Sequence, residues 1–177
     1  MSKIELDETE QALERFLAAV ISKSKANLSK GISASGSLSN SFKSTFNVGA
    51  NSIEASISAE DYLPFIDRGV KGVKSGSSLS GFSYKRKGGG FFKGMPPPKA
   101  FDKWNIIRGR AGRDEKGRFL TRKQLNFKTA AGVFLYGIKP TKFFTNPLEE
   151  EFANLPTELI EAYGLDIEKF MKLILKE

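Results

Sequence analysis

The sequence predicts an α+β protein in which a long N-terminal helix packs on a small antiparallel sheet, formed by a β-hairpin plus a short strand, with further helices and a long inserted basic loop. Three observations predict this class. Apolar residues first recur every three or four positions, and they then alternate at period two. A glycine-rich basic stretch follows, after which helical spacing returns.

The first helix is expected from Ile4 to about Lys30. It carries one apolar stripe: Leu6, Leu13, Phe16, Leu17, Val20, Ile21 and Leu28. Acidic residues gather at its start and lysines at its end, so each group complements the helix dipole at its own terminus. Gly31 is a suitable stop, because glycine readily takes the left-handed conformation that ends many helices.

A β-hairpin is expected after this helix. Alternating apolar residues flank turn residues 49–51: Phe42, Phe46 and Val48 come before the turn, and Ile53, Ala55, Ile57 and Ala59 come after it. This period indicates strands with one buried face. A short helical turn over 62–69 is expected to pack on the hairpin and to end at Gly69.

Further helices are expected in the second half of the chain. Pro98 can open one that buries Phe101, Trp104 and Ile107 and ends at Gly109. The Thr121–Gln124 pair forms a capping box, which predicts a helix over 122–136 that stops at Gly137. Residues 141–145, written TKFFT, are expected as a short strand. A last helical segment should begin with Asn146 as its cap and be interrupted at Pro156.

The predicted organisation is a single domain over 1–177. It includes a flexible glycine-, serine- and lysine-rich arm at about 71–98 and a C-terminal helical segment at about 146–177. A stretch of that length without periodic apolar residues is usually functional or disordered.

Charge is divided unevenly along the chain, whose formal net charge is +8. Residues 1–70 carry a net −2, residues 71–142 a net +15 and residues 143–177 a net −5. A basic middle between two acidic ends usually points to a partner of opposite charge.

The residue types argue against an enzyme. The chain has no histidine and no cysteine, which removes the commonest general base and all thiolate chemistry. The carboxylates of Asp61 and Asp67 and of Glu149–Glu151 are interpreted as helix-terminus and surface charges. We therefore expect no catalytic residue, metal or cofactor, and a small hydrolase is the least favoured hypothesis.

No apolar run approaches the roughly 20 residues that span a bilayer. The acidic, amphipathic start is also unlike a targeting peptide. We expect the protein to act in a cytoplasm or to leave it inside an assembly, without contact to a membrane.

The stretch Lys85–Lys99, written KRKGGGFFKGMPPPK, combines a basic cluster, glycines, two phenylalanines and three prolines. We interpret it as a docking arm that orders on binding, with the phenylalanines as anchors in a neighbouring chain. The predicted interface with a subunit or partner comprises Tyr84, Lys85, Arg86, Lys87, Phe91, Phe92, Arg108, Arg110 and Arg113. Basic residues interleaved with aromatics also fit non-specific nucleic-acid binding, which is the alternative function.

Four stretches together resemble a known family: YLPFIDRGVKGVKSG, MPPPKAFDKWNIIRGR, GRFLTRKQLNFKTAAGVFLYGIKPTKFFTNPLEEEF and LPTELIEAYGLDIEKF. The chain is similar there to small virion proteins of tailed bacteriophages, of the head–tail joining or tail-completion group. Tyr62–Gly69 matches the start of that family's insertion loop, and GIKPTKFFTNPLEEEF matches its end.

The resemblance implies a homo-oligomeric ring in the neck or connector between the capsid portal and the tail. It implies an N-terminal helix over a small antiparallel sheet, with long loops that bridge subunits. The implied partners are other copies of the chain, portal or adaptor and tail proteins, and genomic DNA passing through the ring. The implied location is the neck or tail region of the virion, and the host cytoplasm during assembly. No small-molecule substrate is implied.

Overall fold

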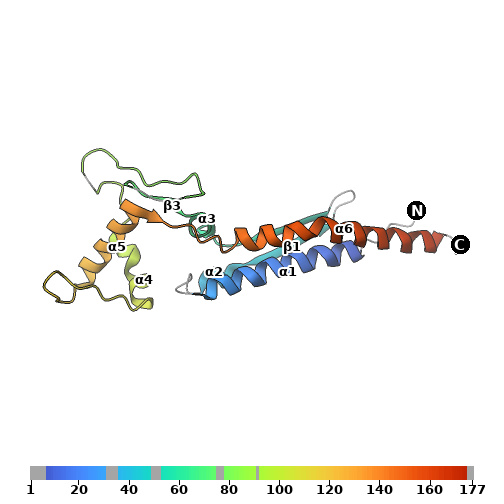
Figure 1. Ribbon diagram of the computed structural model, residues 1–177, viewed down its shortest axis with the longest axis horizontal. Helices are drawn as coiled ribbons and strands as arrows, with labels where there is room; N and C mark the ends of the chain where they lie inside the picture. Colours follow the sequence, from blue (N-terminus) through green and yellow to red (C-terminus); the bar gives the residue numbers. More distant parts are fainter. Residues whose placement is uncertain (1–6, 31–35, 49–52, 75–77, 91, 175–177) are drawn as a thin grey trace. The chain divides into compact units, whose positions relative to one another are not determined.

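A computed structural model describes residues 7–30, 36–48, 53–74, 78–90 and 92–174 (Figure 1). The chain divides into two compact units. The acidic unit comprises Met1–Leu28, Ser39–Ala59 and Phe143–Glu177, with eight basic and fourteen acidic residues. The basic unit comprises Ser29–Leu38 and Glu60–Lys142, with twenty basic and six acidic residues. Since each unit is described by itself, a single domain over 1–177 stays a prediction.

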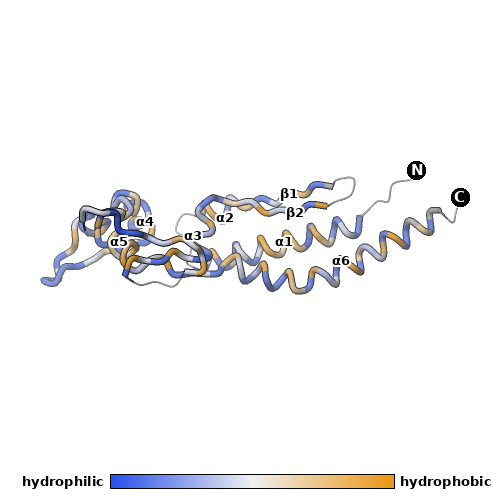
Figure 2. The backbone as a smooth tube through the Cα atoms, turned by 90° about the horizontal axis from the view of Figure 1, so that it is seen from above, coloured by the Kyte–Doolittle hydropathy of each residue, from blue (hydrophilic) through white to orange (hydrophobic). Residues whose placement is uncertain are grey.

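The acidic unit consists of two long helices and a hairpin. Its elements are α1 (Asp7–Ser29), β1 (Lys43–Val48), β2 (Ile53–Ser58) and α6 (Thr145–Ile174). In Figure 2, α1 lies between the hairpin and α6. The two helices are antiparallel, because Thr9 near the start of α1 contacts Asp166 while Lys23 near its end contacts Glu151. A short helix that sequence patterns did not predict, α2 (Ser37–Ser41), precedes β1.

The hairpin is present as predicted, and one of its faces is half-buried. Its strands pair antiparallel from Lys43 opposite Ser58 to Val48 opposite Ile53. Leu17, Val20 and Leu28 of the predicted α1 stripe are buried. Long helix, antiparallel hairpin and further helices together confirm the α+β class. The predicted turn at 49–51 lies outside the described residues.

The basic unit contains short elements around one longer helix. These are α3 (Leu63–Asp67), β3 (Val70–Lys71), the 3-10 helix η1 (Pro98–Phe101), α4 (Asp102–Ile107), α5 (Arg122–Tyr136) and β4 (Gly137–Ile138). β3 and β4 pair antiparallel, with Val70 opposite Ile138. Ala130 and Phe134 of α5 are fully buried.

The predicted capping box is confirmed at the start of α5. The Thr121 amide donates to Gln124 Oε1 at 2.9 Å, and the Gln124 amide donates to Thr121 Oγ1 at 3.4 Å. The helix ends at Gly137, as predicted. There the backbone φ is +79°, and an added Cβ would lie 2.1 Å from the Val70 carbonyl oxygen. Only glycine fits this point, where the chain leaves α5 and pairs with β3.

Two predictions about the segment before and within α6 are wrong. Residues 141–144 form no strand and contain a turn at Phe143–Phe144, and Thr145 already belongs to α6; Lys142 takes a left-handed φ of 52° that breaks an extended strand. Phe143 is buried there, and Phe144 stacks on Phe42 with the ring centroids 6.0 Å apart. Pro156 does not interrupt α6, which runs through it. The packing of Leu155 and Ala162 on either side offsets the lost hydrogen bond.

Two interpretations of acidic residues also need correction. The Glu149–Glu151 triplet lies beyond the first turn of α6, because the helix begins at Thr145. Glu150 and Glu151 instead pair with Lys23 of α1, at 3.4 and 2.6 Å. Asp67 is buried and not a solvated cap, and its carbonyl accepts hydrogen bonds from the amides of Thr141 and Lys142.

Candidate subunit interface

A buried polar network fixes α4 against α5 in the basic unit. The Asn105 side-chain amide donates to Asn126 Oδ1 at 2.8 Å, and Thr129 donates to Asn105 Oδ1 at 3.2 Å. Asp102 accepts from Asn126 at 2.8 Å and from Arg122 at 2.6 Å. These two donors hold the pKa of the Asp102 carboxyl below its ordinary value. Because the loop over 108–121 runs from the end of α4 to the start of α5, the network fixes the distance between the two ends of this loop.

The network also explains why the predicted α4 stripe is wrong in part. Asn105 is the buried residue of α4, whereas Ile107 is exposed and Trp104 is only half-buried. A six-residue helix has one contact face, and here that face is used for hydrogen bonds to α5.

Two of the predicted interface arginines stack on aromatic rings. The Arg110 guanidinium carbon lies 4.1 Å from the Trp104 ring centroid, and that of Arg113 lies 4.0 Å from the Phe119 centroid. Arg113 Nη1 also donates to the Gly117 carbonyl at 2.7 Å. Stacking holds each guanidinium plane in place while leaving some of its N–H donors open to a ligand.

Neighbouring arginines differ in their ion pairs. Arg118 pairs with Asp114 at 2.9 Å, and Arg122 pairs with Asp102 at 2.6 Å. Across the described part of the chain, neither Arg110 nor Arg113 forms an ion pair. No carboxylate among the described residues therefore offsets their positive charge.

Residues of the predicted arm pack along α5. The Tyr84 ring meets Phe134 edge-on at 6.1 Å, and burial raises the pKa of the Tyr84 hydroxyl. The Tyr84 amide donates to the Lys71 carbonyl at 2.9 Å. The arm closes on itself where the Lys87 amide donates to the Lys93 carbonyl at 2.9 Å. Tyr84, Lys85 and Arg86 share the lining of an open cavity of about 480 Å³.

Phe92 has a partner within the chain, so the expectation of an unpacked ring is wrong for this residue. Its ring meets Phe127 of α5 edge-on at 5.3 Å, although the residue remains 38% exposed. Phe91 lies outside the described residues. Insertion of either ring into a neighbouring chain stays a prediction.

The structure therefore groups the predicted residues around α5. Tyr84 and Phe92 contact the helix itself, and Arg108, Arg110 and Arg113 lie in the loop between α4 and α5. Sequence patterns do not single out Ile106 and Phe119, which line a cavity of about 240 Å³ together with Arg110. In the sequence, each of these two residues is recognisable only as an apolar residue in or beside a basic loop. Contact of this group with another subunit stays a prediction.

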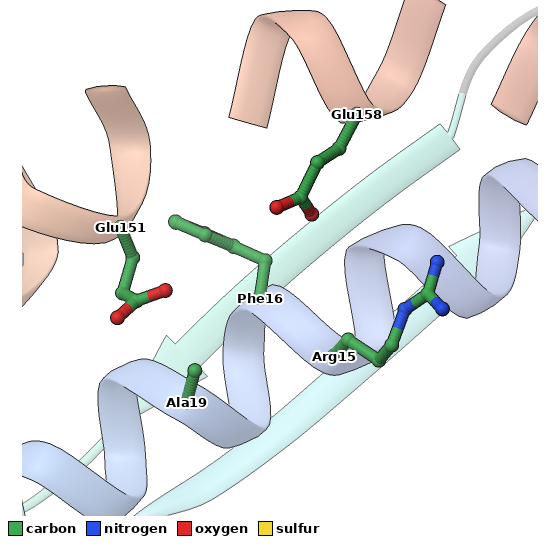
Figure 3. Close-up of a pocket in the computed structure, with 5 residues that line it drawn as sticks. All are labelled: Arg15, Phe16, Ala19, Glu151 and Glu158. Carbon is green, nitrogen blue, oxygen red and sulfur yellow. The ribbon is translucent and has the colours of Figure 1, made fainter. Parts of the chain in front are cut away.

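The acidic unit carries an open cavity of its own, between α1 and α6. It has a volume of about 420 Å³ and is lined by Arg15, Phe16, Ala19, Glu151 and Glu158. Figure 3 shows the Phe16 side chain rising between the two glutamates, while Arg15 points away from them. The Phe16 ring meets Phe152 of α6 edge-on at 6.5 Å. The cavity has an apolar floor of Phe16 and Ala19, and its lining carries both signs of charge, because Arg15 and the Lys23-paired Glu151 lie beside Glu158.

Among the residues that the structure describes, no three carboxylate, histidine or cysteine side chains gather closely enough to bind a metal ion. No helix in this part of the chain is both long and apolar enough to cross a membrane. Comparisons of the chain with protein-family models, with curated proteins and with solved structures find no match.

Proposed function

We propose that the protein is a structural virion component of a tailed bacteriophage. It forms a homo-oligomeric ring in the neck or connector, where it joins the capsid portal to the tail in head–tail joining or tail completion. One observation carries the proposal: the chain holds two compact units of opposite charge, a net −6 in the acidic unit and a net +14 in the basic unit.

Opposite charge on two units of one chain favours contact between unlike surfaces of successive copies. Such a head-to-tail contact repeats from copy to copy, and it gives a ring when the rotation closes. Charge complementarity speeds the encounter and disfavours pairing of like units. We assign the ring to the position between portal and tail because stretches of the sequence resemble head–tail joining proteins. In this role the chain acts by binding and catalyses no reaction.

Deletion of the gene from the phage or prophage that encodes it should stop virion assembly at the neck. We expect electron micrographs of the lysate to show DNA-filled heads and separate tails, and infectious titre to fall by several orders of magnitude. A plasmid copy of the gene should restore joined particles. Complete, infectious virions formed without the protein would contradict the proposal.

Nucleic-acid binding is the second candidate function. The observation that favours it is the pair of stacked guanidinium groups on Trp104 and Phe119, since arginine and aromatic rings also form platforms for single strands. Under our proposal, contact with DNA is secondary and depends mainly on counterion release.

We predict that DNA retention by the purified protein is independent of sequence and nearly vanishes at physiological salt. The triple variant Arg108→Ser, Arg110→Ser and Arg113→Ser should lose no more affinity than a control with Lys71, Lys74 and Lys139 changed to serine, because both remove the same charge from the basic unit. Filter binding over a salt series measures both. Retention that persists at physiological salt and disappears only in the arginine variant would favour the nucleic-acid function.

A further inference from the structure

α6 has two apolar faces, and the described residues of the acidic unit cover only one of them. Leu155 and Ala162 are buried on the covered face, together with Asp166. Large apolar side chains are exposed on a second face, which we call the α6 stripe: Ile160, Tyr163, Ile167 and Met171. Figure 2 shows apolar positions continuing along this part of α6.

The spacing places these residues on one line of the helix. From Ile160 the steps to Tyr163, Ile167 and Met171 are three, four and four residues, which is the period of a single helical face. Ile160 is 74% exposed. A helix that is apolar on two faces is normally covered from two sides, and clustered exposed apolar residues mark a protein contact.

The border of the α6 stripe is acidic. Glu161 and Glu168 follow Ile160 and Ile167 directly and lie seven residues apart, on the same edge. Lys169 binds Glu8 and Lys172 binds Glu168, each at 2.6 Å, so Lys172 partly offsets the charge of Glu168, whereas Glu161 forms no ion pair among the described residues. Two α6 stripes facing each other would bring these glutamates together, so charge disfavours symmetric pairing. The acidic border therefore favours a basic protein surface as the one that covers the α6 stripe.

The basic unit carries a surface with the matching chemistry. We call it the arginine–aromatic surface, and it consists of Trp104, Ile106, Arg110, Arg113 and Phe119. Phe119 is 66% exposed. Arg110 and Phe119 line the cavity of about 240 Å³, which is large enough to receive an apolar side chain. Tryptophan and arginine are the residue types that most often dominate binding at interface centres.

We propose that the α6 stripe of one copy binds the arginine–aromatic surface of the next copy. Apolar side chains of the stripe enter the cavity beside Phe119, and Glu161 and Glu168 face Arg110 and Arg113. This inference rests on the proposed function, because it names the contact that repeats around the ring. Each copy then offers one stripe and one arginine–aromatic surface, so every interface is alike.

The contact predicts a specific result when two variants are mixed. The stripe variant, Ile160→Lys with Ile167→Lys, keeps its arginine–aromatic surface. The surface variant, Arg110→Ser with Arg113→Ser and Phe119→Ser, keeps its stripe. By sedimentation velocity at high protein concentration, each variant alone should be monomeric and the equal mixture should form a 1:1 dimer and nothing larger. The wild-type chain should form larger species under the same conditions.

Two controls separate the interface from folding and from net charge. Asn154→Lys with Leu165→Lys adds the same charge to α6 on another side of the helix, where Leu165 is 50% exposed, and this variant should associate like wild type. All variants should keep the wild-type melting temperature, since the substituted side chains are exposed. The chain has no cysteine, so I160C and F119C copies mixed under oxidising conditions should form a disulfide-linked dimer.

Three outcomes would overturn the inference. Dimers of the surface variant alone would mean that α6 stripes pair with each other. A mixture that stays monomeric while wild type associates would place the ring contact elsewhere and leave the proposed ring intact. Wild type that stays monomeric at every concentration would mean that another protein covers the stripe. The proposed function fails separately, through the gene deletion.

Discussion

Replacing Asp166 with alanine should lower the free energy of unfolding of the acidic unit by about 3 kcal/mol. The carboxylate is 1% exposed and accepts from the Glu8 amide at 3.1 Å, the Thr9 amide at 3.0 Å and the Thr9 hydroxyl at 2.8 Å. It therefore satisfies two of the open N–H groups in the first turn of α1 from a helix far along the chain. Alanine would leave those donors buried and unpaired.

Far-UV circular dichroism measures this effect, since α1 and α6 supply most of the helix. A loss of 3 kcal/mol corresponds to a fall in melting temperature of roughly 12–24 °C for a unit of this size. Glu168→Ala is the matched control, because it removes an exposed carboxylate two residues further along α6 and should leave the melting temperature nearly unchanged. Equal melting temperatures for the two variants would contradict the role of Asp166 as an acceptor for the first turn of α1.

The same carboxylate should make the acidic unit sensitive to low pH. Burial by itself raises the pKa of the Asp166 carboxyl, but the hydrogen bonds from Thr9 and Glu8 outweigh it and leave the pKa below its ordinary value. A carboxyl with a lower pKa in the folded chain stabilises the fold above its unfolded pKa of about 4. That contribution is lost as the pH falls through the folded pKa. The difference in the free energy of unfolding between wild type and Asp166→Ala should therefore become smaller below about pH 4.

Gly137→Ala should destabilise the basic unit by about 3 kcal/mol or more. At Gly137 φ is +79° and ψ is −167°, a region that is almost closed to residues with a Cβ. The added atom would lie 2.1 Å from the Val70 carbonyl oxygen and 2.6 Å from the Gly72 nitrogen. β3 would have to move away from β4, so the pairing of Val70 with Ile138 would be lost.

Fluorescence of the single tryptophan, Trp104, reports on the basic unit during thermal unfolding. Gly132→Ala is the control for this variant. Gly132 lies inside α5, and nothing is within 4 Å of a Cβ built there. This substitution should stabilise α5 by up to about 1 kcal/mol, because alanine favours the helix. A Gly137→Ala chain as stable as wild type would contradict the close approach of β3.

Elements with a local signal could be predicted from sequence. Thr121 and Gln124 are three residues apart and cap α5 through contacts within one turn, so the start of the helix is encoded locally. The hairpin follows from period-two apolar residues on both sides of a turn. β3 and β4 have only two residues each, which is too short for any period to appear.

Features that depend on distant residues could not be predicted. The Asp166 contact joins residues 157 and 158 positions apart, and no local pattern marks it. Pro156 carries a strong local signal for a break, but packing of the flanking turns overrides it. At the candidate interface, sequence located Arg110 and Arg113 but not the rings on which they stack. Apolar periodicity also cannot reveal Asn105 and Asn126, because their burial depends on a hydrogen bond across 21 positions.

The discontinuous make-up of the acidic unit has a consequence for synthesis on the ribosome. α1 and the hairpin emerge early, but the turns of α6 that cover them follow only after the whole basic unit has been translated. At about 5–20 residues per second, the start of α1 waits on the order of ten seconds for Asp166. The basic unit, drawn almost entirely from one continuous stretch, can form during that delay. The order of translation thus completes the basic unit of the nascent chain before the acidic one, so the pairing of unlike units that we propose would be delayed until the acidic unit is complete.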